Sequence, residues 1–135
     1  MAAEDIEFQP AGTVVTASGA SSWVPVPTLT MLMVGIAVTA NVGTPSLTAW
    51  LQGSNDGGTT GFDLLSDQSM KSAETVAAEP TTEEAQNKRN INNNAISAAG
   101  KWSALYKHLA ASHVRLVWIF SGSTSITWGV KARGK

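Results

Sequence analysis

Two stretches of the sequence alternate between apolar and polar or small side chains, and this period of two constrains the fold more than any other feature. The first covers residues 47–52, and the second covers residues 113–132 with a turn at residues 121–124. In the last part, Ile126, Trp128, Val130 and Ala132 share one side. A period of two places alternate side chains on opposite faces of a β-strand and does not fit a helix. The chain is therefore predicted to be all-β.

The turn chemistry between the apolar segments indicates seven or eight antiparallel strands. Pro25 and Pro27 restrict their segment to the edge of a sheet, because proline has no backbone N–H. Residues 29–39 are apolar on both faces, which is typical of a central strand. Residues 113–132 predict a carboxy-terminal hairpin. This spacing favours an antiparallel β-sandwich or jelly roll, with strands over residues 13–17, 23–27, 29–39, 46–52, 61–66, 101–109, 113–120 and 125–132.

The chain of 135 residues has the length of one domain, and we divide it into an arm and a sandwich. Residues 1–11 are acidic and contain Pro10, which predicts an extended N-terminal arm whose anchors are Ile6 and Phe8. Residues 12–135 form the predicted β-sandwich domain. We expect Ile6 and Phe8 to contact a partner, and we expect removal of residues 1–11 to weaken assembly without unfolding the sandwich.

Residues 67–94 interrupt the strand pattern and are too polar to be a core element. Within this insertion, Thr81 begins a capping box, and Glu84 and Lys88 form an i, i+4 pair, which indicates a short helix over residues 82–89. The insertion is either a projecting loop or an arm that orders on a partner. We expect it to reach outward and to contact a partner through four charged residues: Glu83, Glu84, Lys88 and Arg89.

Charge is unevenly distributed along a chain whose net charge is only −1. Residues 1–66 contain five acidic residues and no Lys or Arg, whereas residues 96–135 contain six basic residues and no acidic one. One interpretation is that the acidic amino-terminal part meets the basic carboxy-terminal part, on the same subunit or on a neighbour. The alternative is that both are solvated tails.

Two tryptophans are candidates for binding. Trp50 lies on the polar face of its predicted strand, and Trp23 lies in the proline-rich edge segment. Either indole could serve as an interface residue or as a stacking platform for a glycan. The alternative for Trp50 is a cross-strand contact beneath a loop.

Catalytic and metal-binding patterns are absent from the sequence. Without cysteine it has no disulfides, thiolate metal sites or Cys nucleophiles, and the two histidines, His108 and His113, do not share one face of a strand. No nucleophile elbow or phosphate-binding glycine loop occurs, and residues 55–58 predict a turn rather than a calcium loop. We therefore expect no enzymatic activity, cofactor or metal, and no binding to nucleic acid or membrane. The acidic amino terminus lacks the basic and apolar regions of a signal peptide, so export by that route is not expected.

The segments around these turns resemble the small β-sandwich virion structural proteins of tailed bacteriophages. The resemblance covers residues 12–66 and 98–132 and leaves out the arm and the insertion. It concerns a pattern rather than one protein, and the Ser-Asn-Asp-Gly turn also occurs in carbohydrate-binding modules. The segments that carry it are residues 38–40, 43–47, 51–57, 113–116, 121–123 and 126–128.

The resemblance implies a non-enzymatic structural protein of the phage particle, most specifically a capsid decoration (cement) protein. Its implied partner is the major capsid protein, and the implied assembly is a small homo-oligomer, with a trimer favoured. The implied location is the outer capsid surface, after assembly in the host cytoplasm. Two alternatives stay open: another virion component, such as a fibre or baseplate protein, and a carbohydrate-binding β-sandwich.

Overall fold

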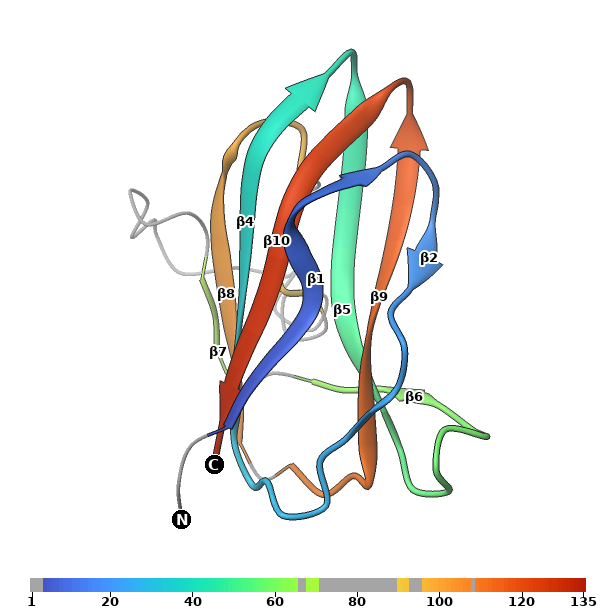
Figure 1. The fold of residues 1–135 in the computed structure, drawn as a ribbon, viewed down its shortest axis with the longest axis vertical. Coiled ribbons are helices and arrows are strands. Elements are labelled where there is room, and N and C mark those ends of the chain that lie inside the picture. Colours follow the sequence, from blue (N-terminus) through green and yellow to red (C-terminus); the bar gives the residue numbers. More distant parts are fainter. Residues whose placement is uncertain (1–3, 66–67, 71–89, 93–95, 108) are drawn as a thin grey trace, which may run out of the picture.

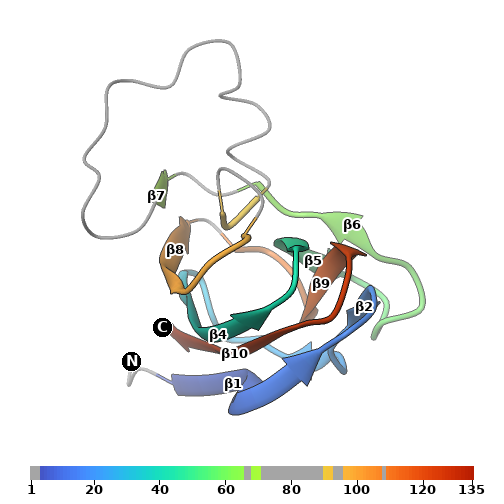
Figure 2. The ribbon, with the colours of Figure 1, turned by 90° about the horizontal axis from the view of Figure 1, so that it is seen from above.

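The protein is a sandwich of two antiparallel sheets, as the alternation predicts (Figures 1 and 2). A computed structural model describes residues 4–65, 68–70, 90–92, 96–107 and 109–135. Sheet A has the order β1-β10-β4-β8-β7, and sheet B has the order β2-β9-β5-β6, with β3 also paired to β9. The strands are β1 (Glu4–Val15), β2 (Gly19–Ala20), β3 (Val24–Pro25), β4 (Leu32–Val42), β5 (Pro45–Ser54), β6 (Phe62–Asp63), β7 (Gln68–Met70), β8 (Gly100–Tyr106), β9 (His113–Gly122) and β10 (Ser125–Gly134).

The core lies between the two sheets and is built from the inward-facing residue of each alternating pair. On β4 the even-numbered residues 32–38 are buried, and on β10 those at 126–132 are buried. Sheet B contributes residues 47, 49 and 51 of β5 and residues 114 and 116 of β9. The rings of Trp118 and Trp128 meet edge to face across this interior, with centroids 5.5 Å apart. The faces predicted from the period of two are therefore confirmed for β5, β9 and β10, whereas no buried face was predicted for β4.

The predicted positions of two strands within the sheets are also confirmed. The proline-containing β3 pairs with β9 at the side of sheet B, and β4 lies between β10 and β8 at the centre of sheet A. Pro25 is paired with His113 at the edge, where its missing N–H removes no central hydrogen bond.

The predicted carboxy-terminal hairpin is wrong, because β9 and β10 belong to different sheets. β9 pairs with β5, and β10 pairs with β4. The turn after β9 and the turn after β4 both cross between the sheets, and they touch where Thr44 Oγ1 and Ser123 Oγ are 3.1 Å apart (Figure 1, top). β9 and β10 each bury one face, and stacking the two strands places these faces against each other across the core.

The structure also corrects the predicted arm, because residues 4–11 are part of β1. This strand pairs antiparallel with β10 along sheet A, with irregular register around Gln9. Phe8 is buried in the core, and Ile6 is half-buried against it. Figure 2 shows β1 lying along β10 as the outer strand of its sheet. The burial of Phe8 therefore removes one of the two side chains that the sequence assigned to a partner.

The end of the polar insertion closes the open side of the sandwich, which its composition does not suggest. Ile91, Asn92 and Ile96 are completely buried. Ile96 exchanges two backbone hydrogen bonds with Leu47 at the edge of β5, and the Ile91 N–H donates to the Ala49 carbonyl. The expectation that residues 67–94 contribute nothing to the core is therefore wrong for the carboxy-terminal end of this insertion. The predicted helix over residues 82–89 lies outside the described residues.

Asn92 replaces a backbone partner at this edge, because its side-chain amide completes the hydrogen bonding of β5. Its Oδ1 accepts from the Ala49 N–H at 3.0 Å, and its Nδ2 donates to the Leu47 carbonyl at 3.1 Å.

An unsatisfied buried donor costs about 1–3 kcal/mol. We expect Asn92→Ala to lower the free energy of unfolding in urea by about that amount. The matched control is Asn41→Ala at an exposed position, which should change little; equal effects of the two variants would contradict this role.

Candidate binding surface

The outer face of sheet A is lined at its centre by residues with small side chains. On β4, Gly35 and Ala37 point outward between the buried Val34, Ile36 and Val38. Gly35 pairs with Ser103 on β8, and Ala37 pairs with Gly129 on β10. Because these neighbours are small as well, the sheet surface is hollowed across β1, β10, β4 and β8.

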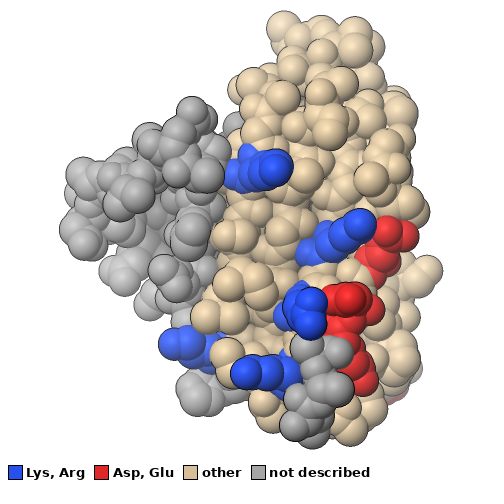
Figure 3. All heavy atoms as spheres, turned by 60° about the vertical axis from the view of Figure 1, so that its left-hand side comes forward, with Lys and Arg blue, Asp and Glu red and all other residues tan. Residues whose placement is uncertain are grey.

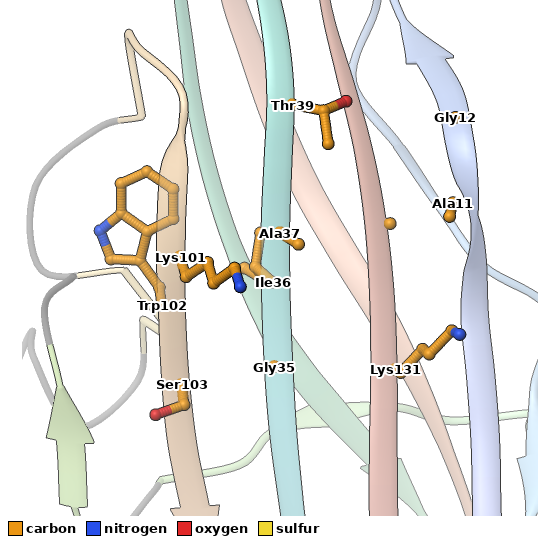
Figure 4. Close-up of a pocket in the computed structure, with 11 residues that line it drawn as sticks. Ala11, Gly12, Gly35, Ile36, Ala37, Thr39, Lys101, Trp102, Ser103 and Lys131 are labelled. Atoms are coloured by element: carbon orange, nitrogen blue, oxygen red, sulfur yellow. The ribbon is translucent and has the colours of Figure 1, made fainter. Parts of the chain in front are cut away.

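This hollow, here called the sheet A groove, has a volume of about 500 Å³ and a mainly apolar lining. Figure 4 shows its lining residues on the four strands, with Gly35 and Ala37 on the central strand between Lys101 and Lys131. The described residues that line it are Ala11, Gly12, Gly35, Ile36, Ala37, Thr39, Lys101, Trp102, Ser103, Gly129 and Lys131. The groove was not predicted from the sequence. The small residues at outward positions of β4 were the available signal.

Lysine residues flank the groove on both sides, and a described acidic residue lies beside one of them. Lys131 Nζ lies 4.0 Å from a carboxylate oxygen of Glu7, and Arg133 lies 3.9 Å from Asp5. Lys101 forms no ion pair with any residue that the structure describes. In Figure 4 the Lys101 side chain extends from β8 toward β4, whereas the Lys131 side chain extends toward β1.

The two cross-strand ion pairs confirm one interpretation of the uneven charge: the acidic amino-terminal part meets the basic carboxy-terminal part on the same subunit. All four side chains are more than half exposed, so each pair contributes at most about 1 kcal/mol to stability. Figure 3 shows the Lys and Arg side chains over the middle and lower part of this side of the molecule, beside the acidic residues. The upper part of the same view is uncharged.

Trp23 and Trp50 lie on the other side of the molecule, in a network on the outer face of sheet B. Trp50 is buried, and its Nε1 donates to Asp63 Oδ1 at 2.8 Å. Gln52 Nε2 donates to the same oxygen, and Gln52 Oε1 accepts two hydrogen bonds from the Arg115 guanidinium. This burial and the pairing of Trp50 with Asn90 favour the cross-strand alternative over a stacking platform.

Trp23 is half-buried, and the rest of the network covers its ring. The Arg115 guanidinium lies 4.6 Å from the ring centroid, in a cation–π contact. The backbone of Gly58 and Gly61 approaches so closely that a Cβ added at either position would meet the indole. The ring thus fixes the loop after β5 against β9 and offers little free surface for stacking a sugar.

The remaining predicted partner-binding residues cannot be placed. Glu83, Glu84, Lys88 and Arg89 lie outside the described residues, so their assignment stays a prediction. The side chains of Ile6 and Phe8 face the core, as described above.

The loop after β5 is a turn, as predicted for residues 55–58, with positive φ angles at Gly57 and Gly58. Asp56 organises it: its Oδ1 accepts from the Thr60 backbone N–H at 2.8 Å and from the Ser54 hydroxyl at 2.7 Å. These hydrogen bonds favour the charged carboxylate and lower the pKa of Asp56 from 3.8 to about 2.

We expect this pKa to appear directly in an NMR titration of the Asp56 carboxyl carbon. Because the pKa is lower in the folded loop than in the unfolded chain, the stabilisation is complete above pH 3.8 and is lost as the pH falls through about 2. Ser54→Ala removes one donor and should raise the pKa toward its usual value. Titration of Asp56 near 3.8 in the unmodified protein would contradict the hydrogen bonding described.

Among the described residues, no three His, Cys, Asp or Glu side chains come close enough together to hold a metal ion. The described residues also include no helix of the length and apolar character needed to cross a bilayer. His113 Nδ1 lies 3.0 Å from the Ser112 hydroxyl.

Comparison with known proteins supports the fold. No protein-family model matches the chain, and no curated protein sequence matches it. The crystal structure of SPBc2 prophage-derived protein YomS aligns with a TM-score of 0.58 over 98% of this chain and 92% of that chain, at 10% sequence identity. A structure of infectious bursal disease virus Gt strain aligns with 39% of its chain at a TM-score of only 0.24 and 16% identity. The YomS likeness extends over almost the whole of both chains and shows a shared sandwich fold.

Proposed function

We propose that this protein is a structural component of a tailed bacteriophage particle, and specifically a decoration protein on the outside of the capsid. The observation that carries the proposal is the fold likeness to a prophage-derived protein over nearly the full length of both chains. The segments that resemble phage virion proteins lie on β4, β5, β9 and β10, the strands that form the centre of the sandwich.

The surface of sheet A suits such a role. A cement protein must bury area against shell subunits, and a stable interface needs roughly 800 Å² on each partner. The outer face of sheet A combines an uncharged region with the apolar sheet A groove, and its two central long strands, β4 and β10, are paired along almost their whole length. An uncharged region beside an apolar groove is suited to contact with the major capsid protein.

The proposal includes an assembly and a location. The protein acts without catalysis, as a small homo-oligomer for which a trimer is favoured, on the outer capsid surface of particles assembled in the host cytoplasm. Several weak contacts per oligomer give high avidity, since each further contact forms at high effective concentration.

The test uses phage particles produced without this protein. Purified protein should sediment with these particles and raise the temperature at which they release DNA. Particles that retain their own copies serve as the control and should take up little additional protein. Absence of binding, or binding to isolated tails but not to heads, would contradict the decoration role.

A further inference from the structure

We propose that the sheet A groove binds an extended peptide segment that carries acidic side chains. The occupant is a segment of another protein that crosses the strands of sheet A. The groove's shape, its charge and the chemistry of its lining each support this occupant.

The shape of the groove suits a main chain with short apolar side chains. The groove crosses from β1 to β8, which is three strand spacings of about 4.8 Å, or about 14 Å. An extended peptide advances about 3.3 Å per residue, so about four residues fit across it. Gly35 and Ala37 form the floor on β4 and leave space at the surface of the sheet, while Gly129 on β10 lets the backbone of Ala11 lie close against the sheet.

The charge of the groove favours an acidic occupant. Lys101 and Lys131 lie on opposite sides of the floor, and none of the described residues that line the groove is acidic. Glu7 partly balances Lys131 from β1, whereas Lys101 forms no ion pair with a described residue. A carboxylate of the incoming peptide would form an ion pair with Lys101, which would increase both the association rate and the specificity.

The lining favours a peptide over an acidic saccharide. A sugar needs hydrogen-bonding side chains and an aromatic face, but among the described lining residues the polar side chains are those of Thr39, Ser103 and the two lysines. The Trp102 ring packs over Gly100 on its own strand, where an added Cβ would lie 3.0 Å from the indole. The apolar floor instead matches the alternating small side chains of an extended chain.

The inference deepens the proposed function, because it names a segment of the capsid protein as the occupant of the groove. Only the source of the peptide rests on the proposed function. Peptide binding to the isolated protein can be measured without particles. If the protein binds phage particles but does not bind the acidic peptide, the assignment of the groove alone is overturned. Peptide binding without particle binding would overturn the decoration role alone.

The experiment uses a blocked hexapeptide of alternating valine and glutamate, with the valine and lysine peptide as its counterpart. Binding is followed by NMR chemical shifts of the protein backbone. The acidic peptide should shift signals at Gly35, Ala37, Lys101 and Gly129, and the affinity should fall as salt is raised. The basic peptide should produce no saturable shifts.

Two variants test the groove, and each has a matched control. Lys101→Glu should weaken binding by about tenfold or more, while Lys107→Glu, exposed just after the same strand and outside the groove, should change it by less than about twofold. Gly35→Val should abolish binding by filling the floor, while Met33→Val, outward on the same strand beside the groove, should not. A Cβ at Gly35 would have only the Lys131 carbonyl oxygen near it, at 3.9 Å, so this variant is expected to fold, and thermal unfolding checks it.

Three outcomes would overturn the inference. The first is equal binding of the acidic and basic peptides, and the second is unchanged binding in folded Gly35→Val and Lys101→Glu. The third is binding of an oligogalacturonate at these residues with no binding of the acidic peptide, which would assign the groove to a saccharide.

Discussion

Replacing Gly122 by alanine is expected to lower the free energy of unfolding by about 3–5 kcal/mol, which combines backbone strain and a steric clash. Gly122 has a φ angle of 90°, which favours glycine, and an added Cβ would collide with the backbone carbonyl oxygen of Thr44. Thr44 belongs to the other sheet-crossing turn and precedes β5, so neither backbone can move without disturbing the β5–β9 pairing. Urea denaturation monitored by tryptophan fluorescence measures the loss.

The control for this substitution is Gly57→Ala. Gly57 has a φ angle of 75°, similar to that of Gly122, but an added Cβ would meet no heavy atom within 4 Å. Only the conformational strain of about 1–2 kcal/mol should remain. If both variants lost the same stability, the two turns would not be packed on each other as described.

Replacing Phe8 by alanine is expected to lower the free energy of unfolding by about 3–5 kcal/mol, the usual range for a buried phenylalanine. The Phe8 side chain is only 5% exposed and packs in the core between the sheets. Val14→Ala on the same strand provides the control, because Val14 is 59% exposed and its loss should change stability by less than about 0.5 kcal/mol.

The stability of these variants distinguishes between the strand that the structure shows and the arm that the sequence predicts. If residues 1–11 were an arm outside the sandwich, Phe8→Ala and deletion of these residues would both leave the unfolding transition unchanged. The structure predicts that the deletion destabilises the sandwich, because it removes Phe8 and exposes the edge of β10. An unchanged transition in both variants would favour the arm.

The sequence predicts the strands and their buried faces well, because the period of two directly reports which side chains point inward. Ile126, Trp128 and Val130 are buried as predicted, and so are Leu47 and Leu51. The alternation contains no information about which strand lies beside which, since a tight turn connects either two strands of one sheet or two stacked strands. The carboxy-terminal hairpin was predicted incorrectly for this reason.

Two further errors come from weighting composition above pattern. Residues 5–8 alternate between acidic and apolar side chains, and this alternation indicates a strand, but their charge suggested an arm. Asn92 is polar and yet completely buried, because its amide pairs with the backbone of β5. Composition alone cannot identify a side chain that replaces a strand partner.

The candidate surface was harder to predict than the fold. A groove on a sheet requires small residues on neighbouring strands, and the register that aligns Gly35 with Ser103 and with Lys131 is a property of the folded sheet. Conversely, Trp23 and Trp50 are candidates by residue type, but the fold uses both in packing with Asp63 and Arg115.

Sheets A and B thus have different outer faces. Sheet B is covered by the network that holds the loop after β5, whereas sheet A presents a groove between cationic side chains. Contact through sheet A would leave the loops at residues 55–61 away from the partner. This orientation is a geometric consequence of the proposed role and can be observed directly.

The most direct measurement is a cryo-electron microscopy reconstruction of the mature phage particle. The proposed role predicts density for this sandwich on the outer capsid surface, repeated around the shell, with sheet A facing the capsid protein. Density for the sandwich confined to the tail, or its absence from the particle, would contradict the role.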